Sequence, residues 1–210
     1  MAESAKIEAF FDDRTKPVSY LVWDPATKAA AVIDPVLDYD PASGEIDTAS
    51  AELILATAPD RGLTIGFILD THAHADHLSA AAVLKARTGA KTGIGARIGE
   101  VQSRFAELFG ADDVRPNAGD FDLLLGDGET LPLGQLVVEV IDTPGHTPAC
   151  VSYRVGDAVF VGDTIFMPDY GTSRTDFPGG DARQLYRSLK RLLALPPETR
   201  LFLCHDYKAP

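Results

Sequence analysis

The strongest constraint on this chain is a cluster of histidines that directly follows an apolar run. Residues 65–69 read Ile-Gly-Phe-Ile-Leu, and residues 71–77 then read Thr-His-Ala-His-Ala-Asp-His. The protein has five histidines, and three of them lie in this heptapeptide. Neutral imidazole is the commonest metal ligand, and carboxylates complete such sites. The segment therefore predicts a metal site in a loop that leaves a strand, with four donors: His72, His74, Asp76 and His77.

Further donors follow other predicted strands. His146 lies in Pro-Gly-His-Thr-Pro, a turn rigid enough to hold an imidazole in place. Asp163 comes at the end of an apolar strand, where a carboxylate needs a partner to offset its desolvation. His205 follows the strand predicted at 200–203. A lone histidine is more often a hydrogen-bonded core residue, but five of five histidines in loops after strands favour a shared metal site.

The charge and the cysteine content narrow the class of protein. The chain has 19 Lys and Arg against 31 Asp and Glu, which argues against nucleic acid, because phosphates need a basic footprint. No apolar run reaches the ~18 residues of a membrane span, and the N-terminus lacks a signal pattern. Two cysteines do not make a disulfide framework in 210 residues. We expect a cytoplasmic protein that binds neither nucleic acid nor membrane.

Apolar patterning predicts a layered α/β fold in one domain spanning residues 1–210. Strands are expected at 7–11, 18–23, 29–33, 63–69, 90–96, 121–125, 131–133, 136–141, 150–155, 158–161 and 200–203. Helices are expected at 48–58, 79–87 and 98–108, and in a segment capped by Asp181 that buries Leu185, Leu189 and Leu192. We interpret the apolar stripe of the third helix as core and residues 38–47 as a surface loop. This order predicts two mostly antiparallel sheets with helices outside.

The motifs, taken in order, resemble the metallo-β-lactamase superfamily. They are His-x-His-x-Asp-His, Thr-Pro-Gly-His-Thr, Gly-Asp-Thr and Cys-His-Asp, and the resemblance spans residues 18–206. It implies an αββα sandwich of two mixed, mostly antiparallel sheets with helices outside and the metal site at one edge of the sheets. Many class B β-lactamases carry a cysteine ligand where this chain has Asp163, which disfavours a true β-lactamase.

Two groups within that superfamily compete. Glyoxalase II enzymes are similar in having all seven candidate ligands, and they hydrolyse a glutathione thioester with two metals and a bridging hydroxide. ETHE-like persulfide dioxygenases resemble the chain more closely, because they share Thr-His-x-His-Ala-Asp-His, Ser/Thr-Pro-Gly-His-Thr-Pro-x-Cys and Gly-Arg-Thr-Asp-Phe, which is close to residues 173–177. Segments 34–40 and 167–171 resemble the bacterial branch of the dioxygenases, some of whose members are labelled β-lactamase-like hydrolases.

The closer resemblance implies a mononuclear Fe(II) on His72, His146 and Asp163. Two histidines and one carboxylate on one face of iron leave three positions for O2 and a persulfide sulfur. The implied reaction turns glutathione persulfide, O2 and water into sulfite and glutathione. Zinc, as one or two ions, would instead suit the hydrolytic alternative. The remaining donors would lie in the pocket or around the iron ligands, with Asp76 also expected to be catalytic: His74, Asp76, His77 and His205.

Substrate contacts are also implied by the resemblance. Arg174 would hold a glutathione carboxylate, because a planar guanidinium matches it with two hydrogen bonds. Asp176 and Tyr186 are expected to help, although packing on a helix face is an equal alternative for Tyr186. Cys150 and Cys204 are interpreted as buried packing, with an approach to substrate sulfur as the alternative for Cys150.

Two departures from these groups keep other interpretations open. Five residues follow His205, whereas glyoxalase II continues into a helical region that contributes to glutathione binding. The loop at 167–170 is altered and could shift the substrate choice. A non-catalytic metal- or thiol-sensing module is therefore a third hypothesis, motivated by this C-terminus and the acidic loop at 38–47. A homodimer is also left open.

Overall fold

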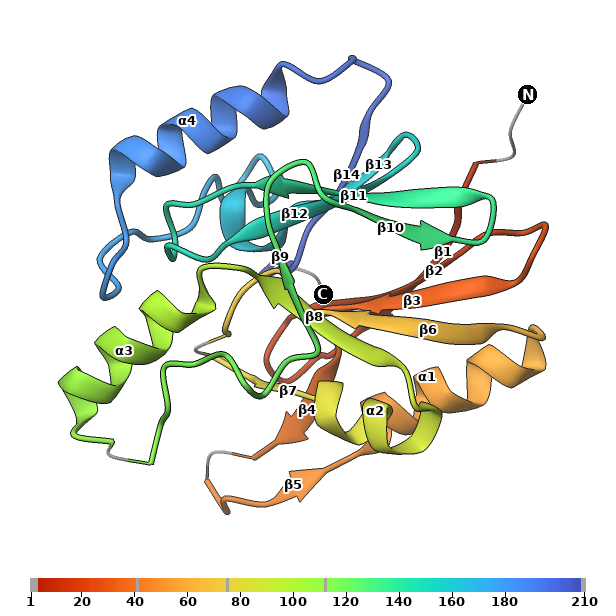
Figure 1. Ribbon diagram of the computed structural model, residues 1–210, viewed down its shortest axis with the longest axis horizontal. Helices are drawn as coiled ribbons and strands as arrows, with labels where there is room; N and C mark the ends of the chain where they lie inside the picture. The colour runs from red at the N-terminus through yellow and green to blue at the C-terminus, as the bar shows by residue number, and fades with distance from the viewer. Residues whose placement is uncertain (1–3, 41, 75, 112, 209–210) are drawn as a thin grey trace.

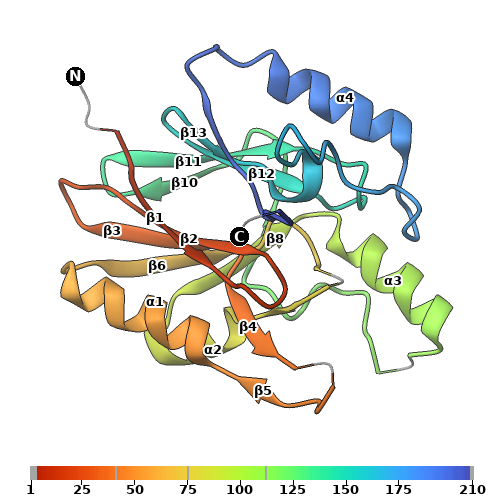
Figure 2. The same cartoon turned by 180° about the vertical axis from the view of Figure 1, so that it is seen from behind.

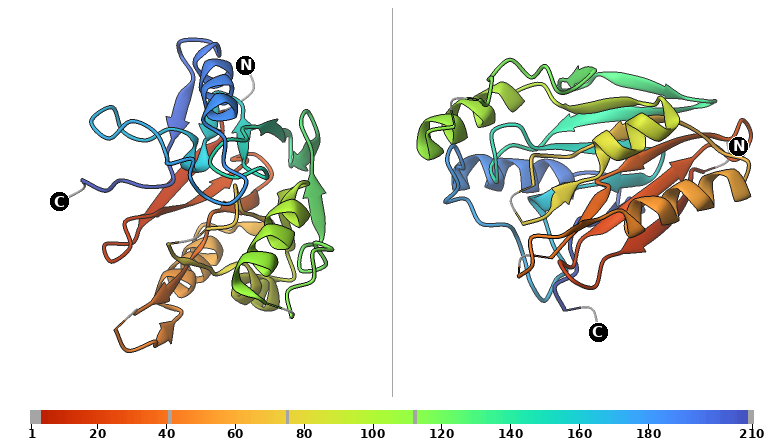
Figure 3. Two further views of the ribbon diagram at one scale, coloured as in Figure 1. Left: turned by 90° about the vertical axis from the view of Figure 1, so that its left-hand side faces the viewer. Right: turned by 90° about the horizontal axis from the view of Figure 1, so that it is seen from below.

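Two facing sheets with helices on their outer sides form the frame of the protein (Figures 1 and 2). The computed structural model of the protein describes residues 4–40, 42–74, 76–111 and 113–208. In the end-on view of Figure 3, α4 (Ala182–Leu193) and α1 (Ala49–Asp60) lie on opposite sides of the paired sheets. This layering confirms the predicted αββα sandwich. None of the described helices has the length and apolarity needed to cross a bilayer.

The first sheet has six strands in the spatial order β1, β2, β3, β6, β8, β9. The first three pair antiparallel, whereas β3, β6, β8 and β9 pair in parallel. Parallel neighbours need crossover connections, and α1, α2 (Ala81–Thr88) and α3 (Ile98–Phe109) supply them. The strand bounds are β1 Lys6–Phe11, β2 Val18–Trp23, β3 Ala29–Ile33, β6 Thr64–Leu69, β8 Lys91–Gly95 and β9 Leu123–Leu125.

The second sheet has the order β10, β11, β12, β13, β14, and only its last pair is parallel. A third, small sheet pairs β4 with β5 and with β7. A short 3-10 turn, η1 (Gly162–Thr164), follows β13. The remaining bounds are β4 Val36–Tyr39, β5 Ile46–Asp47, β7 Leu78–Ser79, β10 Thr130–Leu133, β11 Leu136–Asp142, β12 Val151–Val155, β13 Ala158–Phe160 and β14 Arg200–Phe202.

The alternation of side chains along β2 shows how the sheets are packed. Tyr20 and Val22 face the core between the two sheets, whereas Leu21 faces the core under α1 and α2. Tyr20 packs on Phe160 and Phe202 of the second sheet, with ring centroids 5.1 and 5.5 Å away. Both sides of the first sheet are therefore buried, which explains the near-continuous apolar runs in its central strands.

Loops that leave β6, β13 and β14 at their carboxyl ends meet at one edge of the sandwich. The amide of Val151 in β12 donates to the carbonyl of Thr71, at 2.9 Å, and so ties the second sheet to the loop after β6. The loop after β13 carries Asp163, and the segment after β14 carries His205. The topology thus gathers the donors that the sequence predicts.

Several local predictions are wrong. The expected surface loop at 38–47 contains strands β4 and β5. Helix α1 begins at Ala49, one residue later than expected, and the carboxylate of Asp47 accepts hydrogen bonds from the amides of Thr48 and Ala49. Helix α2 begins at Ala81, because β7 takes up the positions just before it.

The apolar stripe of α3 is core only in its first turns. Ile98 and Val101 are buried, whereas Leu108 is 61% exposed. The reason is geometric, because α3 extends away from the sheets toward its C-terminal end (Figure 1).

Removing a ring from the stacked aromatic cluster should strongly lower the stability of the fold. Phe160 is 1% exposed, and its ring lies 5.0 Å from that of Phe202. Phe160→Ala removes the ring and leaves a cavity, so we expect the free energy of unfolding to fall by about 3–5 kcal/mol. Urea denaturation measures this loss. Phe109→Ala is the matched control because Phe109 is 71% exposed, and equal losses in the two variants would contradict the prediction.

Candidate metal centre

A buried carboxylate at the end of β3 fixes the loop that carries the first histidines. Asp34 accepts hydrogen bonds from the amide of Thr71, at 2.7 Å, and from the Thr71 hydroxyl, at 2.9 Å. Burial opposes ionisation, but the hydrogen bond and charge of His74 and the Thr71 amide together hold the pKa of Asp34 below its ordinary value. Asp34 is therefore an anionic anchor for this loop.

His72, His146 and Asp163 form a buried donor group. The Nε2 atoms of His72 and His146 each lie 3.8 Å from Oδ2 of Asp163. The other ring nitrogens are already engaged, because Nδ1 of His146 lies 2.9 Å from the carbonyl of Arg174 and Nδ1 of His72 lies 3.0 Å from the Thr71 hydroxyl. An acceptor at Nδ1 keeps the proton there and leaves the lone pair of Nε2 free to bind a metal.

Two glycines allow these donors to approach one another. Gly162 has φ +54, and a Cβ there would lie 2.5 Å from the hydroxyl oxygen of Thr71. Gly145 precedes His146, and a Cβ there would lie 2.4 Å from the backbone of Leu185 in α4. Side chains at either position would push the segments apart, so the glycines explain the local motifs in physical terms.

Asp76, His77 and His205 form a second donor group on the outer side of Asp163. Nε2 of His205 lies 2.9 Å from Oδ2 of Asp76, and its Nδ1 lies 2.8 Å from Oδ1 of Asp163. Burial favours the neutral ring, but these two carboxylates outweigh it and raise the pKa of His205 to about 10. Asp163 thus holds His205 through Nδ1, while the His205 ring stacks on Tyr207 with centroids 4.9 Å apart.

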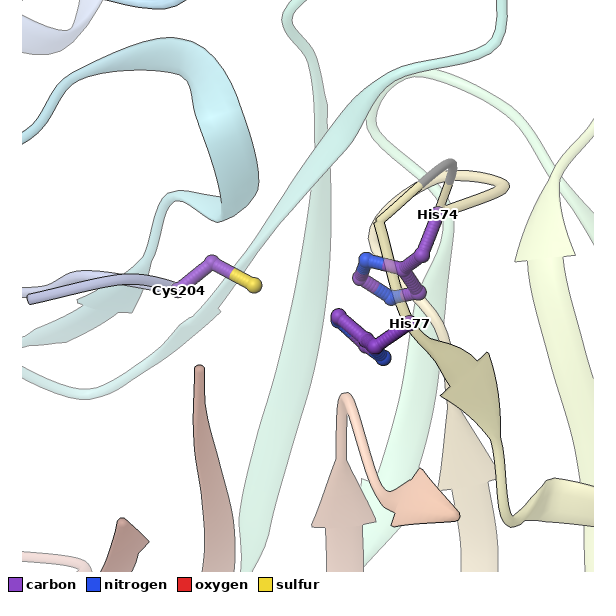
Figure 4. A group of neighbouring side chains, drawn as sticks. All are labelled: His74, His77 and Cys204. Atoms are coloured by element: carbon purple, nitrogen blue, oxygen red, sulfur yellow. The ribbon is translucent and has the colours of Figure 1, made fainter. Parts of the chain in front are cut away.

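His74 belongs to a third group, with His77 and Cys204. The ligand atoms of these three residues all lie within 4.8 Å of one another, and Figure 4 shows the thiol pointing toward both rings. Nε2 of His74 lies 3.2 Å from Oδ1 of Asp34. All seven donors predicted from the sequence are therefore brought to one edge of the sandwich, but they divide into overlapping groups.

A cavity of about 450 Å³ opens above Asp163. Aromatic rings line much of it, and Arg174 lies in its wall, over the ring of Phe177 at 4.8 Å. Asp176, rather than lining the cavity, holds the guanidinium of Arg174 through two hydrogen bonds of 2.6 and 2.7 Å. The residues that line the cavity are Asp76, His146, Asp163, Phe166, Tyr170, Thr172, Ser173, Arg174, Phe177 and Tyr207.

Two predicted contacts lie elsewhere. Tyr186 is 64% exposed on α4 and does not line this cavity, because the face of α4 that packs inward carries Leu185 and Ser188 instead. Cys150 is 4% exposed; its sulfur accepts a hydrogen bond from the amide of Thr147 and lies 3.2 Å from the Thr147 hydroxyl. Burial raises the pKa of the Cys150 thiol to about 12, which fits the packing interpretation and not an approach to substrate.

Several residues of this site were not predicted from the sequence. Asp34 and Thr71 anchor the metal loop, and Phe166, Tyr170 and Tyr207 wall the cavity. Asp34 had a usable signal, because it ends an apolar strand just as Asp163 does. The three aromatic residues of the cavity wall had no sequence signal apart from their position near the motifs.

The anchoring role of Asp34 is testable by substitution. Asp34→Asn leaves one acceptor oxygen for the two Thr71 donors and removes the charge beside His74, so we expect metal affinity to fall about 10–100-fold. Competition with a chelating indicator measures this affinity. Asp24→Asn is the matched control, because Asp24 is equally buried and accepts hydrogen bonds from Thr27 and Gln135 in a different turn. An unchanged affinity in Asp34→Asn would refute the role.

Comparisons of the sequence with known proteins agree with this geometry. The sequence pattern of the Metallo-beta-lactamase superfamily matches residues 13–205. A Burkholderia pseudomallei protein named "Probable metallo-hydrolase" is 51% identical over 96% of this chain and 72% of its own length. A Xylella fastidiosa protein named "Beta-lactamase hydrolase-like protein" is 49% identical over 98% of this chain. The match covers about half, 48%, of the length of that relative.

Relatives with more specific names fall into both of the competing groups. The mouse protein named "Persulfide dioxygenase ETHE1, mitochondrial" is 30% identical over 96% of this chain and 68% of its own length. A Methylococcus capsulatus protein named "Hydroxyacylglutathione hydrolase" is 34% identical over 90% of this chain and 61% of its own length. Among solved structures, ETHE1 from Myxococcus xanthus has a TM-score of 0.79 and 34% identity, covering 98% of this chain and 77% of that chain.

Proposed function

The chain belongs to the metallo-beta-lactamase superfamily, and from this premise we propose that it is a mononuclear iron persulfide dioxygenase acting on glutathione persulfide. The observation that carries the proposal is the group of His72, His146 and Asp163, with both Nε2 atoms 3.8 Å from one carboxylate oxygen. Ligand atoms ~2.0–2.2 Å from a cation lie about 3–4 Å from one another, so the group fits a metal. Two histidines and one carboxylate with open positions are typical of non-haem Fe(II) oxygenases.

His205 holds one oxygen of Asp163, because its Nδ1 lies 2.8 Å from Oδ1. Its Nε2 lies 2.9 Å from Asp76 but makes no hydrogen bond. We therefore assign His205 a positioning role: it holds Oδ1 of Asp163 and so directs its Oδ2 toward His72 and His146.

The proposed reaction balances without a further reactant. One persulfide, one O2 and one water give one thiol and one sulfurous acid, which ionises to sulfite; the terminal sulfur loses four electrons and O2 gains four. His72, His146 and Asp163 would hold the ion, and Fe(II) bound there would supply the redox chemistry and open positions for both reactants. Aromatic side chains line part of the cavity, and the cavity wall also carries Arg174 for the substrate carboxylate.

Arg174 can bind a carboxylate without releasing Asp176. Asp176 takes the Nε and one Nη2 donor, whereas a guanidinium has five N–H donors. The Nη1 edge therefore remains as a second fork for a planar carboxylate. Asp176 thus orients Arg174 rather than binding substrate itself.

A dinuclear hydrolase of a glutathione thioester is the second candidate. Two observations favour it: the group of Asp76, His77 and His205 has the donors for another ion, and a relative named as a hydroxyacylglutathione hydrolase is 34% identical. Zinc would suit this reaction, because it activates bound water and does not change its oxidation state.

Metal loading and turnover separate the two functions. We expect iron-loaded protein to contain about one iron per chain, to consume O2 with glutathione persulfide and to release sulfite. His146→Ala should lower this activity more than about 100-fold, because it removes a metal ligand and not only a residue that hydrogen-bonds to a ligand. An oxygen electrode, a sulfite assay and metal analysis measure these values. Iron-loaded protein that consumes no O2 overturns the proposal, and two zinc ions with thioester cleavage would favour the hydrolase.

The substrate role of Arg174 has a separate test. Charge-assisted hydrogen bonds contribute about 1.5–3 kcal/mol, so Arg174→Gln should raise KM for glutathione persulfide roughly 10–100-fold. A small alkyl persulfide without a carboxylate should show no such change. Arg183→Gln, at an exposed position of α4, is the matched control. A similar loss with both substrates would show that Arg174 supports the fold of the cavity instead.

A further inference from the structure

We propose that a groove beside α4 binds an acidic segment of a partner protein in an extended conformation. The groove has a volume of about 560 Å³, and its walls are one face of α4 and the residues at the end of β11, Asp142 and Pro144. It shares no lining residue with the cavity assigned to substrate. The groove is therefore a separate site, and the proposal does not depend on the proposed dioxygenase.

One wall of the groove carries three arginines. Arg183, Arg187 and Arg191 recur every four residues, so they lie along the same face of α4. Arg191 pairs with Asp127, whereas Arg183 and Arg187 make no ion pair within the described part of the chain. Two guanidiniums in this wall are thus without an acidic partner there.

Positive charge is concentrated on this helix of an otherwise acidic protein. The chain has 19 Lys and Arg against 31 Asp and Glu, whereas α4 carries Arg183, Arg187, Lys190 and Arg191 and no acidic residue. In Figures 1 and 2, no other described helix or strand lies beyond α4 on its outer side. Most of the protein surface would repel an acidic ligand, so such a ligand would be steered toward α4.

The spacing of the arginines matches that of side chains in an extended peptide. A helix rises ~1.5 Å per residue, so arginines four residues apart lie ~6 Å apart along α4. In an extended strand, alternate side chains point the same way and lie ~6.6–6.8 Å apart. A segment with Asp or Glu at every second position would therefore present one carboxylate to each arginine. A planar guanidinium can bind each carboxylate with two hydrogen bonds.

The other wall favours a peptide over a chain of phosphates. Asp142 lines the groove, and its carboxylate makes no hydrogen bond among the residues that the structure describes. A peptide has backbone N–H groups that can donate to this carboxylate. A phosphodiester backbone has acceptors and negative charge only, so Asp142 would repel it. The groove thus combines donors for acidic side chains with an acceptor for a main chain.

An NMR titration tests the proposal on the full chain. The Nε–H signals of the arginines are followed at low salt while a hexapeptide that alternates Glu and Ser is added. A second peptide, with three Glu followed by three Ser, has the same charge but presents only two carboxylates on one side. We expect the signals of Arg183 and Arg187 to shift. Binding of the alternating peptide should be about 2–5-fold tighter, because an exposed ion pair contributes about 0.5–1 kcal/mol.

Charge reversal at two positions of α4 locates the site. Arg187→Glu should weaken binding of the alternating peptide at least ~10-fold, because it places a carboxylate against an acidic ligand. Lys190→Glu is the matched control, since it makes the same change of charge on the same helix but outside the groove. It should weaken binding no more than ~2-fold. Equal losses in the two variants would show a diffuse attraction to α4 and overturn the groove as the site.

The remaining outcomes are equally decisive. Absence of shifts with the alternating peptide, or equal affinity for the two peptides, overturns the proposal even if a variant fails to fold, which circular dichroism would reveal. Tighter binding of an oligothymidylate, or of phosphatidylcholine vesicles that contain phosphatidylserine, would assign α4 to a different class of ligand and also overturn it. Oxygen consumption by iron-loaded Arg187→Glu should equal that of the wild-type protein, because Arg187 lies outside the substrate cavity.

Discussion

The bonds between Thr71 and the buried carboxylate of Asp34 are the constraint on which the site depends. Asp34 lies just past the end of β3 and Thr71 just past the end of β6, so these bonds join two parallel strands at their carboxyl ends. The carbonyl of Thr71 accepts from Val151 of the second sheet. Thr71 therefore links three parts of the structure: strands β3 and β6 of the first sheet, the second sheet, and the start of the histidine loop.

Thr71 also sets how closely the loop that carries His72 and the η1 turn that carries Asp163 approach each other. The hydroxyl of Thr71 contacts Asp34 and Nδ1 of His72, and it lies against the backbone of Gly162. Because Gly162 has no side chain, η1 can bring Asp163 to within 3.8 Å of the His72 imidazole. Thr71 and Gly162 are far apart in the sequence, but the close approach of His72 and Asp163 depends on both of them.

The donors could be predicted from the sequence because each follows an apolar strand and because histidine occurs nowhere else in the chain. Their grouping could not, because the 3.2 Å contact of His74 with Asp34 depends on the pairing of β3 with β6, which periodicity does not specify. The prediction of Tyr186 as a substrate contact is a different case, because the sequence itself contains a reason against it. A buried stripe through Leu185 and Leu192 places Tyr186, the residue after Leu185, off that face, so helical phase alone argued against it.

Overlap between the donor groups has a chemical consequence. Asp163 belongs to the inner group with His72 and contacts His205 of the outer group, while His77 belongs to both the outer group and the group with Cys204. His77 has one free ring nitrogen and so can ligate in only one group at a time, whereas the two oxygens of Asp163 can serve two groups. A cation bound by His72, His146 and Oδ2 of Asp163 leaves Oδ1 of Asp163 paired with His205.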